Sequence, residues 1–583
     1  MAIDMVKLKI NGLDVEIPRG VTVLDAAHKL GIRIPTLCYM RNINALGGCR
    51  ICVVKVKGYR SFVAACVHPV SEGMEVQTNT DALREARKTT LELTLSNHKM
   101  ECLSCERSLN CELQALAREY GVDQNKFACS DLSHIEIDDS APHLVRDNSK
   151  CILCRKCIAV CKHNQHVGVI GANYRGYHTK VGSPFDMELD NTSCIYCGQC
   201  VAVCPTAALT EKSDKQKLWD ALEDKSKHLV IATAPAIRAQ LGECFGMPIG
   251  TNVSGKMVTA LRRLGFKKVF DVVCAADFTI MEEGTELISR MENGGPFPLF
   301  TTCCPSWVKY MEHYYPGKLE NMSSCKSPQQ MYGAIMKTYY AEKEGVAPEN
   351  MYVASVMPCV TKKFEVTREH QNAAGYPDVD VVVTTNELAA MIKQAGIVFE
   401  DLPDSDFDPA FGIASGAGHI FGATGGVCEA ALRTVSEVVT GKPLEKLEFH
   451  EVRGVRGIKE AEYDLNGKKL KVAVVSGTAN AKQLMDMIER GEKEYHFVEV
   501  MGCPGGCVNG GAQPYQPGYI RNFMNISAER AKALYSEDSS ATLRKSHENP
   551  VVKEIYDTYL GKPGGHKAHE LLHTTYVKRG VYK

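Results

Sequence analysis

Two stretches of the chain, CILCRKCIAVC at residues 151–161 and CIYCGQCVAVCP at residues 194–205, repeat one cysteine spacing, C-x2-C-x2-C-x3-C. This spacing is typical of proteins that hold two 4Fe–4S clusters, in which the fourth cysteine of each run binds the cluster of the other run. The repeat therefore predicts two clusters whose ligands are shared between the two stretches.

The crossed pattern assigns four thiolates to each cluster, with zinc binding as a minor alternative. The first cluster is expected on Cys151, Cys154, Cys157 and Cys204. The second is expected on Cys161, Cys194, Cys197 and Cys200. Lys162 stands where such a run usually has proline, which is a small departure. We expect residues 136–212 to form a two-cluster 4Fe–4S ferredoxin domain.

The composition is that of a globular protein with several domains. Of 583 residues, 44% are hydrophobic and 23% charged, and 68 basic residues balance 69 acidic ones, which gives no electrostatic reason to expect nucleic acid or a membrane as partner. The sequence has no run of 18 apolar residues, and its start reads as neither a signal peptide nor a twin-arginine signal. We therefore expect a cytoplasmic protein whose 25 cysteines serve metal or redox chemistry rather than disulfides.

Four cysteines near the N-terminus predict a further cluster. They follow the order C-x10-C-x2-C-x13-C between short predicted strands, at Cys38, Cys49, Cys52 and Cys66. Plant-type 2Fe–2S ferredoxins have the same order with a shorter first loop. The glycines of ALGG beside Cys49 would let backbone N–H groups approach the sulfides. Residues 1–82 are thus expected to form a β-grasp 2Fe–2S ferredoxin domain, with a four-cysteine zinc site as the alternative.

A third group of ligands falls within 14 residues, in LSNHKMECLSCERSLNC. It consists of His98, Cys102, Cys105 and Cys111. By itself this set fits a zinc site as well as a cluster. Its position between two cluster-binding modules favours a His-ligated 4Fe–4S cluster in a module of residues 83–135.

The rest of the chain has a different pattern. Apolar strand-like runs alternate with helical stretches over residues 228–510, which predicts a large, two-lobed α/β catalytic domain with parallel sheets at residues 225–514. Three strand ends carry cysteine, in TTCCPSW (301–307), MPCVTKKFE (357–365) and EVMGCPGGCVNGGAQP (499–514). Sites in such folds lie at the carboxyl ends of strands. Residues 515–583 are expected to form a helical segment that packs on this domain.

At these three motifs the sequence resembles the iron-only (FeFe) hydrogenases, and the resemblance extends over the accessory modules. It implies an H-cluster, in which one cysteine joins a 4Fe–4S cubane to a di-iron site with CO, CN⁻ and dithiolate ligands. The implied cubane ligands are Cys304, Cys359, Cys503 and Cys507, of which Cys507 bridges to the di-iron unit. Lys362 would donate to a cyanide, as expected of a fixed cation beside an anionic ligand.

The resemblance also implies residues around this cluster. The pocket positions are Pro235, Gln329, Met357, Phe421 and Met501. The family's proton relay maps to Arg290 and Glu286 near solvent, followed by Ser323, Glu283 and Cys303. Departures from the family pattern are Thr302, Ser306, Ala512 and, where a serine often stands, Ala236. Without the motifs, the two glutamates and Lys362 would read as solvated helix positions, and the two methionines as core residues.

Five further cysteines match no ligand set and are expected to be small buried hydrophobic residues: Cys129, Cys244, Cys274, Cys325 and Cys428. No G-x-G-x-x-G motif opens a βαβ unit, so this chain is not expected to bind NAD or flavin itself.

The predicted function is that of an anaerobic FeFe hydrogenase, an oxidoreductase that catalyses reversible H2 oxidation and proton reduction. Electron transport would pass through four accessory iron–sulfur clusters, one 2Fe–2S and three 4Fe–4S. By resemblance the chain is the catalytic subunit of an NAD- and ferredoxin-linked electron-bifurcating complex, with ferredoxin, a flavin- and NAD-binding diaphorase subunit and a small 2Fe–2S subunit as partners. The alternatives are a monomeric ferredoxin-dependent hydrogenase, a non-catalytic iron–sulfur electron-transfer subunit and a relative without an H-cluster that assembles or senses clusters.

Overall fold

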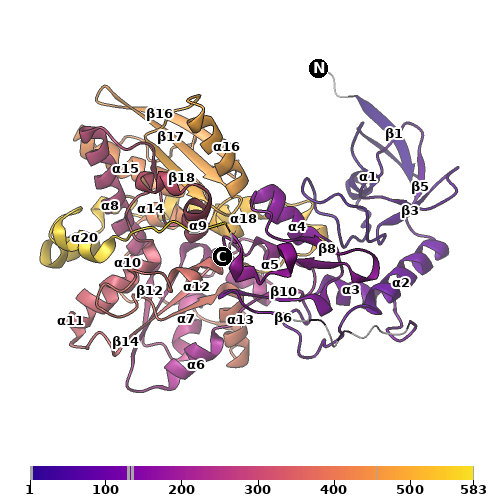
Figure 1. The fold of residues 1–583 in the computed structure, drawn as a ribbon, viewed down its shortest axis with the longest axis horizontal. Helices are drawn as coiled ribbons and strands as arrows, with labels where there is room; N and C mark the ends of the chain where they lie inside the picture. Colours follow the sequence, from indigo (N-terminus) through magenta and orange to yellow (C-terminus); the bar gives the residue numbers. More distant parts are fainter. Residues whose placement is uncertain (1–3, 128–131, 133–134, 136, 456, 582–583) are drawn as a thin grey trace.

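The computed structural model describes residues 4–127, 132, 135, 137–455 and 457–581. The N-terminal modules lie at one end of an elongated molecule, and the large C-terminal part of the chain forms the other end (Figure 1). Among the described residues, no helix is both long and apolar enough to cross a bilayer.

The N-terminal module is a small five-stranded sheet in the order β2-β1-β5-β3-β4, as expected for a β-grasp domain. Its strands are β1 (Met5–Ile10), β2 (Leu13–Pro18), β3 (Val53–Val56), β4 (Val63–Ala64) and β5 (Glu75–Gln77). Asn11 and Gly12 both have positive φ, at 51° and 84°, as the tight turn between β1 and β2 requires. A capping box of Thr22 and Asp25 starts helix α1 (Val23–Lys29), whose apolar face packs on the sheet.

The two cysteine runs fold alike. In each run the second residue after the first cysteine has positive φ, at 54° in Leu153 and 57° in Tyr196. Two residues later, Arg155 and Gly198 are left-handed as well, and each starts a short helix, α4 (Lys156–Ala159) or α5 (Gln199–Val203). The sequence repeat is therefore also a repeat of backbone conformation. Around it lie the antiparallel sheet β10-β7-β6 and the hairpin β8–β9, built from β6 (Ile137–Asp138), β7 (Leu144–Asp147), β8 (Gly171–Asn173), β9 (Lys180–Gly182) and β10 (Leu209–Glu211).

The large part of the chain contains two four-stranded sheets, which form the two predicted lobes. The first, in the order β12-β11-β14-β15, is entirely parallel. The second, in the order β13-β18-β17-β16, is parallel except for its edge strand β16. The strands are β11 (His228–Thr233), β12 (Lys268–Asp271), β13 (Leu299–Phe300), β14 (Met351–Met357), β15 (Val381–Thr384), β16 (Ile458–Leu465), β17 (Lys468–Ser476) and β18 (Phe497–Met501).

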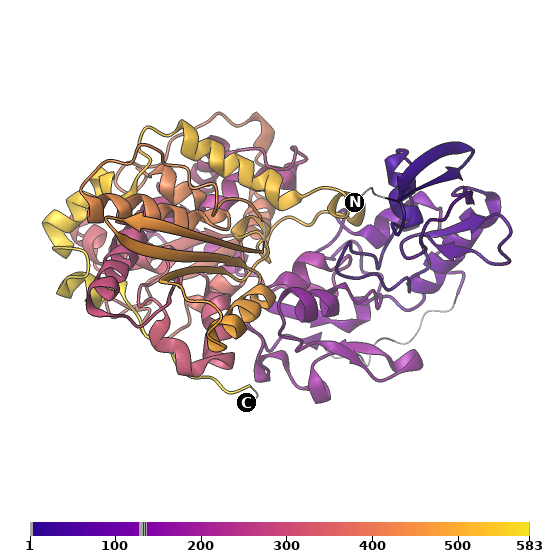
Figure 2. The same ribbon diagram turned by 90° about the horizontal axis from the view of Figure 1, so that it is seen from above.

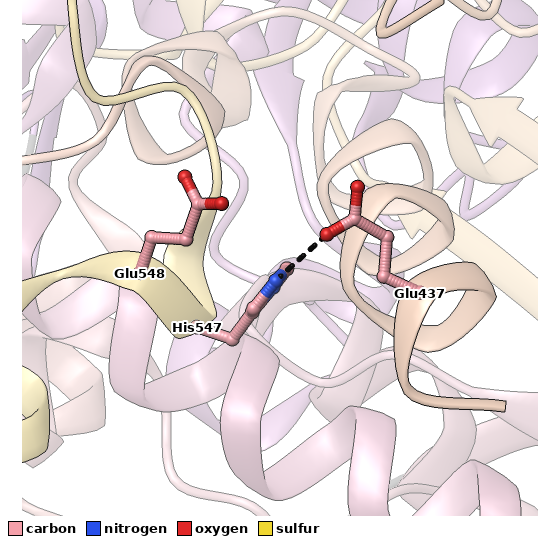
Figure 3. A group of neighbouring side chains, drawn as sticks. All are labelled: Glu437, His547 and Glu548. Atoms are coloured by element: carbon pink, nitrogen blue, oxygen red, sulfur yellow. Dashed lines mark hydrogen bonds and ion pairs between the residues drawn. The ribbon is translucent and has the colours of Figure 1, made fainter. Parts of the chain in front are cut away.

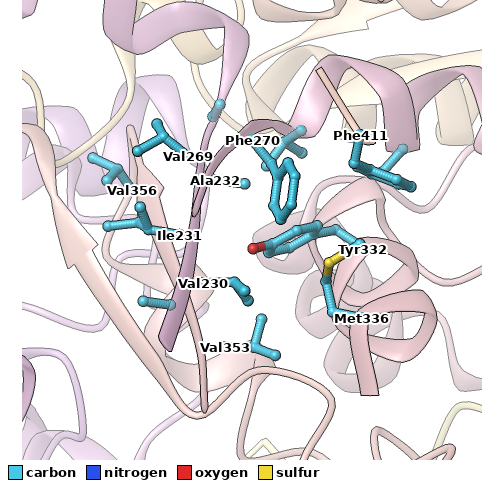
Figure 4. Packing of buried hydrophobic residues seen from close by; sticks show 14 of the residues in the cluster. Val230, Ile231, Ala232, Val269, Phe270, Tyr332, Met336, Val353, Val356 and Phe411 are labelled. Atoms are coloured by element: carbon cyan, nitrogen blue, oxygen red, sulfur yellow. The ribbon is translucent and has the colours of Figure 1, made fainter. Parts of the chain in front are cut away.

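The largest core lies in the first lobe, where apolar residues of β11 and β14 lie near the rings of Phe270 from β12, Tyr332 from α10 and Phe411 from a turn (Figure 4). Phe270 lies edge-on to Tyr340, at 5.4 Å between ring centroids, and Phe278 stacks on Phe411 at 6.0 Å. Such continuous apolar strands are typical of a parallel sheet covered on both faces. The core fixes the carboxyl ends of these strands, where the predicted site lies.

Six helices matter for the site, and four of them (α8, α9, α12 and α13) come soon after a strand. They are α8 (Val272–Asn293), α9 (Pro305–Tyr314), α10 (Pro328–Ile335), α12 (Thr361–Glu365), α13 (Thr385–Gln394) and α15 (Gly426–Thr440). Before the first lobe, the charged stretch after the ferredoxin domain forms α6 (Lys215–Glu223), which contacts α13.

The C-terminal segment is helical and packs on the large domain, with α17 (Gly518–Arg521), α18 (Ile526–Ser540), α19 (Pro550–Ile555) and α20 (His566–Leu572). It also reaches back to the N-terminal modules (Figure 2). Phe523 stacks on His28 at 3.6 Å between ring centroids, and Tyr519 lies under the guanidinium of Arg33. The segment thus holds the two ends of the molecule together.

Candidate active site

Three strand ends bring the cysteine motifs of the large domain to one place. Cys303 and Cys304 follow β13, Cys359 follows β14, and Cys503 and Cys507 follow β18. All five line one cavity of about 70 Å³ between the two lobes. The cavity is therefore formed at the carboxyl ends of strands from both sheets, where ligand sites of α/β proteins lie.

The four predicted cubane ligands interact with one another. Burial, followed by repulsion from the thiolates of Cys304, Cys359 and Cys507, raises the pKa of Cys503 far above its usual value. Burial likewise raises the pKa of Cys359 to about 11. Burial also raises the pKa of Cys507, so three of these thiols disfavour the thiolate, and a metal reverses this preference because it binds the deprotonated form.

The surrounding backbone requires glycine in order to approach the cysteines. A Cβ atom on Gly502 would lie 2.2 Å from the hydroxyl of Ser306, and one on Gly510 would lie 2.1 Å from the carbonyl oxygen of Pro358. The amide of Gly502 donates to the sulfur of Cys304 at 3.2 Å. Such N–H···S contacts stabilise a bound cluster. The donor set and the glycine backbone therefore fit an iron–sulfur group held by four thiolates.

The pocket residues implied by the family resemblance line the same cavity. They are Pro235, Gln329, Met357, Phe421 and Met501. Ala236 also lines it and presents a methyl group where a serine would offer a hydroxyl. Met357 and Met501 belong to hydrophobic core clusters, as their interpretation as core residues expects, and both also line the cavity.

Lys362 is buried beside the cysteines, so its interpretation as a solvated helix position is wrong. Its Nζ donates to the carbonyl oxygen of Cys303 at 3.1 Å and to Oε2 of Glu365 at 2.9 Å. Burial opposes the charge, but Glu365 and the thiol of Cys359 outweigh it and raise the pKa of Lys362. A permanent cation therefore stands in the cavity wall. Glu365 closes the MPCVTKKFE motif, and its i, i+3 spacing from Lys362 is the sequence signal for this pair.

Hydrogen bonds join three of the five residues of the predicted relay. Arg290 donates to Oε1 of Glu286 at 2.7 Å, and the Ser323 hydroxyl donates to Oε2 of Glu286 at 2.9 Å. Ser323 also lies close to Glu283, whose carboxylate is electrostatically coupled to Cys303. Glu286 is partly exposed and Glu283 is fully buried, so the predicted proton relay runs from near the surface to the cavity.

Glu283 has the properties of a proton acceptor and donor. Burial, followed by repulsion from Glu286, raises its pKa to about 8. Its Oε1 accepts from the amide of Thr302 at 3.4 Å, while its Oε2 has no hydrogen-bond partner among the residues that the structure describes. A carboxyl group with a pKa near neutrality can both take up and release a proton.

The ferredoxin domain brings together both predicted ligand sets. A small cavity of about 20 Å³ is lined by the first set, Cys151, Cys154, Cys157 and Cys204. In the second set, burial and then the charges of Cys194 and Cys161 raise the pKa of Cys200. Cys204 therefore lies with the first run although it belongs to the second, as the crossed pattern predicts.

The predicted 2Fe–2S ligands fall into two electrostatically coupled pairs in the N-terminal domain. Cys38 lowers the pKa of Cys49 to about 6, while Cys49 raises that of Cys38. Cys66 lowers the pKa of Cys52, while Cys52 raises that of Cys66. Three of these four cysteines are buried, and Cys49 is half-buried.

The predicted ligand group of His98, Cys102, Cys105 and Cys111 is more exposed to solvent than the other ligand groups. His98 is largely buried, which lowers its pKa, and its Nδ1 lacks a hydrogen-bond partner within the described part of the chain. Cys105 lies near Cys111 and raises its pKa in addition to the effect of burial. Cys102 is exposed. A neutral imidazole with an unpartnered buried nitrogen is available as a metal ligand.

The second ferredoxin ligand set lies against the active-site cavity. Gly198 and Gly511 touch so closely that a Cβ atom on Gly511 would lie 2.6 Å from the Cα of Gly198. Gln199 donates to the carbonyl oxygen of Asn509 at 2.8 Å, and the thiol of Cys197 is electrostatically coupled to that of Cys503. A cluster in this set would be the immediate neighbour of the four-cysteine cavity.

One residue at this junction carries no signal in the sequence. Nζ of Lys309 donates to the carbonyl oxygen of Cys194 at 2.7 Å and lies 4.0 Å from the ring centre of Tyr196. Burial lowers its pKa to about 8. Lys309 is on α9, directly after the Cys304 motif, and its cation is therefore placed between the two sites.

A further group with possible metal ligands lies away from the cavity, at Glu437, His547 and Glu548 (Figure 3). His547 contacts Glu437 at 3.1 Å. The ammonium of Lys545 already pairs with Glu437 at 2.8 Å and with Glu548 at 3.2 Å. The group is therefore an ion-pair cluster.

The remaining cysteines agree with the expectation of buried thiols in three cases. Cys274, Cys325 and Cys428 are buried, while Cys244 is half-buried. Cys129 lies outside the described residues.

Comparison with known proteins gives matches along the chain. Residues 227–511 match the family "Iron only hydrogenase large subunit, C-terminal domain", and residues 524–579 match "Iron hydrogenase small subunit". Residues 4–81 match a 2Fe-2S iron-sulfur cluster binding domain, residues 87–126 the NADH-ubiquinone oxidoreductase-G iron-sulfur binding region, and residues 150–208 a 4Fe-4S dicluster domain.

Two relatives are similar to this chain over nearly its whole length. The chain is 46% identical to the NADP-reducing hydrogenase subunit HndD of Solidesulfovibrio fructosivorans over 99% of both chains. It is 45% identical to iron hydrogenase 1 of Clostridium pasteurianum over 98% of this chain and 99% of the relative. Among solved structures, a variant of the [FeFe]-hydrogenase HydA1 from Chlamydomonas reinhardtii matches with a TM-score of 0.57 and 42% identity, over 63% of this chain and all of that one.

Proposed function

Because this chain belongs to the iron-only hydrogenase family and is thus an oxidoreductase that acts on H2, we propose that it interconverts H2 with two protons and two electrons in both directions. We place the reaction at an H-cluster held in the four-cysteine cavity. The observation that carries this proposal is the convergence of Cys304, Cys359, Cys503 and Cys507 on one buried cavity that is also lined by Cys303 and Lys362.

In this proposal Cys304, Cys359, Cys503 and Cys507 would hold the H-cluster. When bound, the H-cluster supplies the metal centre at which electrons and protons meet. Lys362 fixes an ammonium group beside an anionic ligand, since it is held in place by Glu365 at 2.9 Å. Pro235, Met357, Phe421 and Met501 exclude water from the cavity that they line.

The chain's own residues deliver the protons. Glu286 exchanges protons with solvent, since its side chain is 17% exposed. Ser323 passes them on as a hydroxyl that both donates and accepts, and Glu283 then exchanges them with the thiol of Cys303. Arg290 does not carry a proton, because a guanidinium stays charged, but it holds Glu286 in place.

Electrons pass through four accessory clusters, held by the four ligand groups of the N-terminal modules. The close contact of Gly198 with Gly511 supports the cluster on Cys161, Cys194, Cys197 and Cys200 as the one that exchanges electrons directly with the cavity. Because Cys102 is exposed, the cluster of the His98 module is the one that we expect to exchange electrons with a partner protein.

We further propose that the chain works as the catalytic subunit of an NAD(P)-linked, electron-bifurcating complex with flavin-containing and small 2Fe–2S subunits. The support is the 46% identity, over 99% of both chains, to a protein named as a subunit of an NADP-reducing hydrogenase. The second candidate, a monomeric hydrogenase that uses ferredoxin, is favoured by the 45% identity to iron hydrogenase 1.

The test is to produce the chain together with H-cluster assembly proteins and to record its infrared spectrum and its H2-dependent reduction of viologen. We expect bands of metal-bound CO and CN⁻ and rapid reduction. A chain that binds iron but shows no such bands and no turnover would be an electron-transfer or cluster-assembly protein. Purified alone, the chain should reduce viologen or ferredoxin but not NAD(P)⁺, and direct reduction of the nucleotide would contradict the subunit proposal.

A further inference from the structure

The last residues of the C-terminal segment pair with the loop that carries Ser323. The backbone amide of Lys326 donates to the carbonyl oxygen of Leu572, and the amide of Thr574 donates to that of Ser324, each at 2.8 Å. Cys325 and His573 form an antiparallel bridge between these two bonds. Residues 572–574 thus act as a short strand alongside residues 324–326.

His573 adds a side-chain contact on each side of this bridge. Its Nδ1 lies 2.8 Å from the hydroxyl of Ser324, and its Nε2 lies 3.0 Å from Oε2 of Glu282. The carboxylate of Glu282 also accepts from the amide of Gly564 and the hydroxyl of Tyr556. Because a carboxylate oxygen can only accept, Nε2 of His573 donates to Glu282, which leaves Nδ1 to face the hydroxyl of Ser324.

Both serines of the loop meet Glu286. The hydroxyl of Ser323 donates to Oε2 of Glu286 at 2.9 Å, and the amide of Ser324 donates to the same oxygen at 3.3 Å. The carbonyl oxygen of Ser323 in turn accepts from the hydroxyl of Tyr576 at 2.5 Å. The C-terminal segment therefore fixes the carbonyl of Ser323 and the side chain of Ser324, while Ser323 presents its hydroxyl to Glu286.

We propose that residues 572–576 position the proton relay, with His573 as the positioning residue. Glu282, one residue before Glu283 on α8, holds His573, and His573 holds Ser324, so that the spacing between α8 and the serine loop is set from both sides. This segment lies within residues 524–579, which match the small-subunit family. In this proposal residues 572–576 order the relay. The proposal rests on the proposed function of Ser323 and Glu286 in proton transfer.

Positioning matters because a hydroxyl relay works only at hydrogen-bond distance. A shift of about 1 Å in a reacting group can lower a rate by roughly 10²-fold. Since the side chain of His573 is 6% exposed and that of Glu282 is fully buried, the contact is not one that solvent would replace without cost.

The first measurement is amide hydrogen exchange of residues 322–326 in the cofactor-free protein. We expect His573→Ala to lose protection there, and Tyr576→Phe, which removes only a hydroxyl, to lose less. His573→Gln, whose amide can accept from Ser324 and donate to Glu282, should recover part of the protection. His566→Ala is the matched control, because His566 is an exposed histidine at the start of α20. Unchanged exchange in His573→Ala would overturn the proposal.

The second measurement is made on the loaded enzyme. His573→Ala should reduce turnover about tenfold or more, with an increased solvent isotope effect, an unchanged KM for H2 and unchanged infrared bands. If His573→Ala does not fold, Ser324→Ala removes the same contact by deleting one hydroxyl and is judged by the same two results. Should Cys303→Ala turn over normally, the relay itself would be wrong, whereas the exchange result would still decide whether the segment orders the loop.

Discussion

Nζ of Lys362 lies 2.9 Å from Oε2 of Glu365, and both side chains are buried. The same carboxylate oxygen accepts from the hydroxyl of Ser327 at 2.9 Å and from the amide of Gln329 at 3.0 Å. The pair is therefore neutral as a unit, and what Lys362 offers to the cavity is a fixed N–H donor rather than an uncompensated charge. This arrangement suits a ligand that needs orientation more than neutralisation.

Lys362→Met should leave Glu365 buried without its cation. Breaking a buried pair on one side costs about 3–5 kcal/mol, so the free energy of unfolding of the cofactor-free protein should fall by roughly that amount in chemical denaturation. Lys362→Met with Glu365→Gln should recover most of the loss, because the carboxylate is then neutral as well. Equal stability of the single and double variants would show that the pair does not act as a unit.

Cys303→Ala should separate proton delivery from cluster binding. Four other thiols already surround the cavity, so iron content and infrared bands should persist, while turnover should fall by a factor on the order of 10² or more. Cys507→Ala is the contrasting variant, since it should lose the di-iron bands altogether. Near wild-type turnover in Cys303→Ala, with the cluster intact, would remove this thiol from the relay.

Glu283→Gln should alter how stability depends on pH. The pKa of Glu283 is raised to about 8 in the folded protein, so the folded state binds a proton that the unfolded state releases above its lower pKa. The stabilisation by this proton is fully present at low pH and is lost as the pH rises through about 8. Between pH 6 and pH 8 the wild type should therefore lose about 2 kcal/mol that Glu283→Gln does not lose. Parallel denaturation curves for the two proteins would contradict the raised pKa.

Gly511→Ala should widen the junction between the ferredoxin domain and the catalytic domain. Its Cβ would lie 2.3 Å from the carbonyl oxygen of Cys197, and backbone cannot yield as a flexible side chain can. We expect slower reduction of the accessory clusters by H2 in rapid-freeze spectroscopy, with infrared bands close to those of the wild type. Gly317→Ala, at a glycine with open space around it, is the control and should behave as wild type.

The family, the fold class and the hydrogenase activity follow from the sequence and are confirmed by the comparisons. For the accessory clusters the reason is that the ligands of each run lie close together in the sequence, so their spacing records the geometry. The cavity cysteines of the catalytic domain lie up to about 200 residues apart, and there the motif around each cysteine carries the resemblance. The ligand assignments themselves stay predictions, which the convergence of Cys304, Cys359, Cys503 and Cys507 supports.

What the sequence does not reveal depends on contacts between distant segments. His573 meets Ser324 and Glu282 across about 250 and 290 residues of chain, and no local pattern marks such a contact. Lys309 looks like an ordinary charged residue of a helix, yet it lies buried beside Cys194. From the sequence, Glu283 and Glu286 could equally have been solvated residues on the surface of a helix. The burial of Glu283 in the structure excludes that alternative for this residue.

The stacking of Phe523 on His28 sets an order of events during synthesis. The ring of Phe523 packs against the core of the N-terminal domain, but almost 500 residues of chain separate it from His28. At about 5–20 residues per second, a ribosome needs roughly 25–100 s to make that stretch. The N-terminal domains thus have time to fold and to receive their clusters while the catalytic half is still being made. Their fixed alignment with that half is among the last steps of maturation.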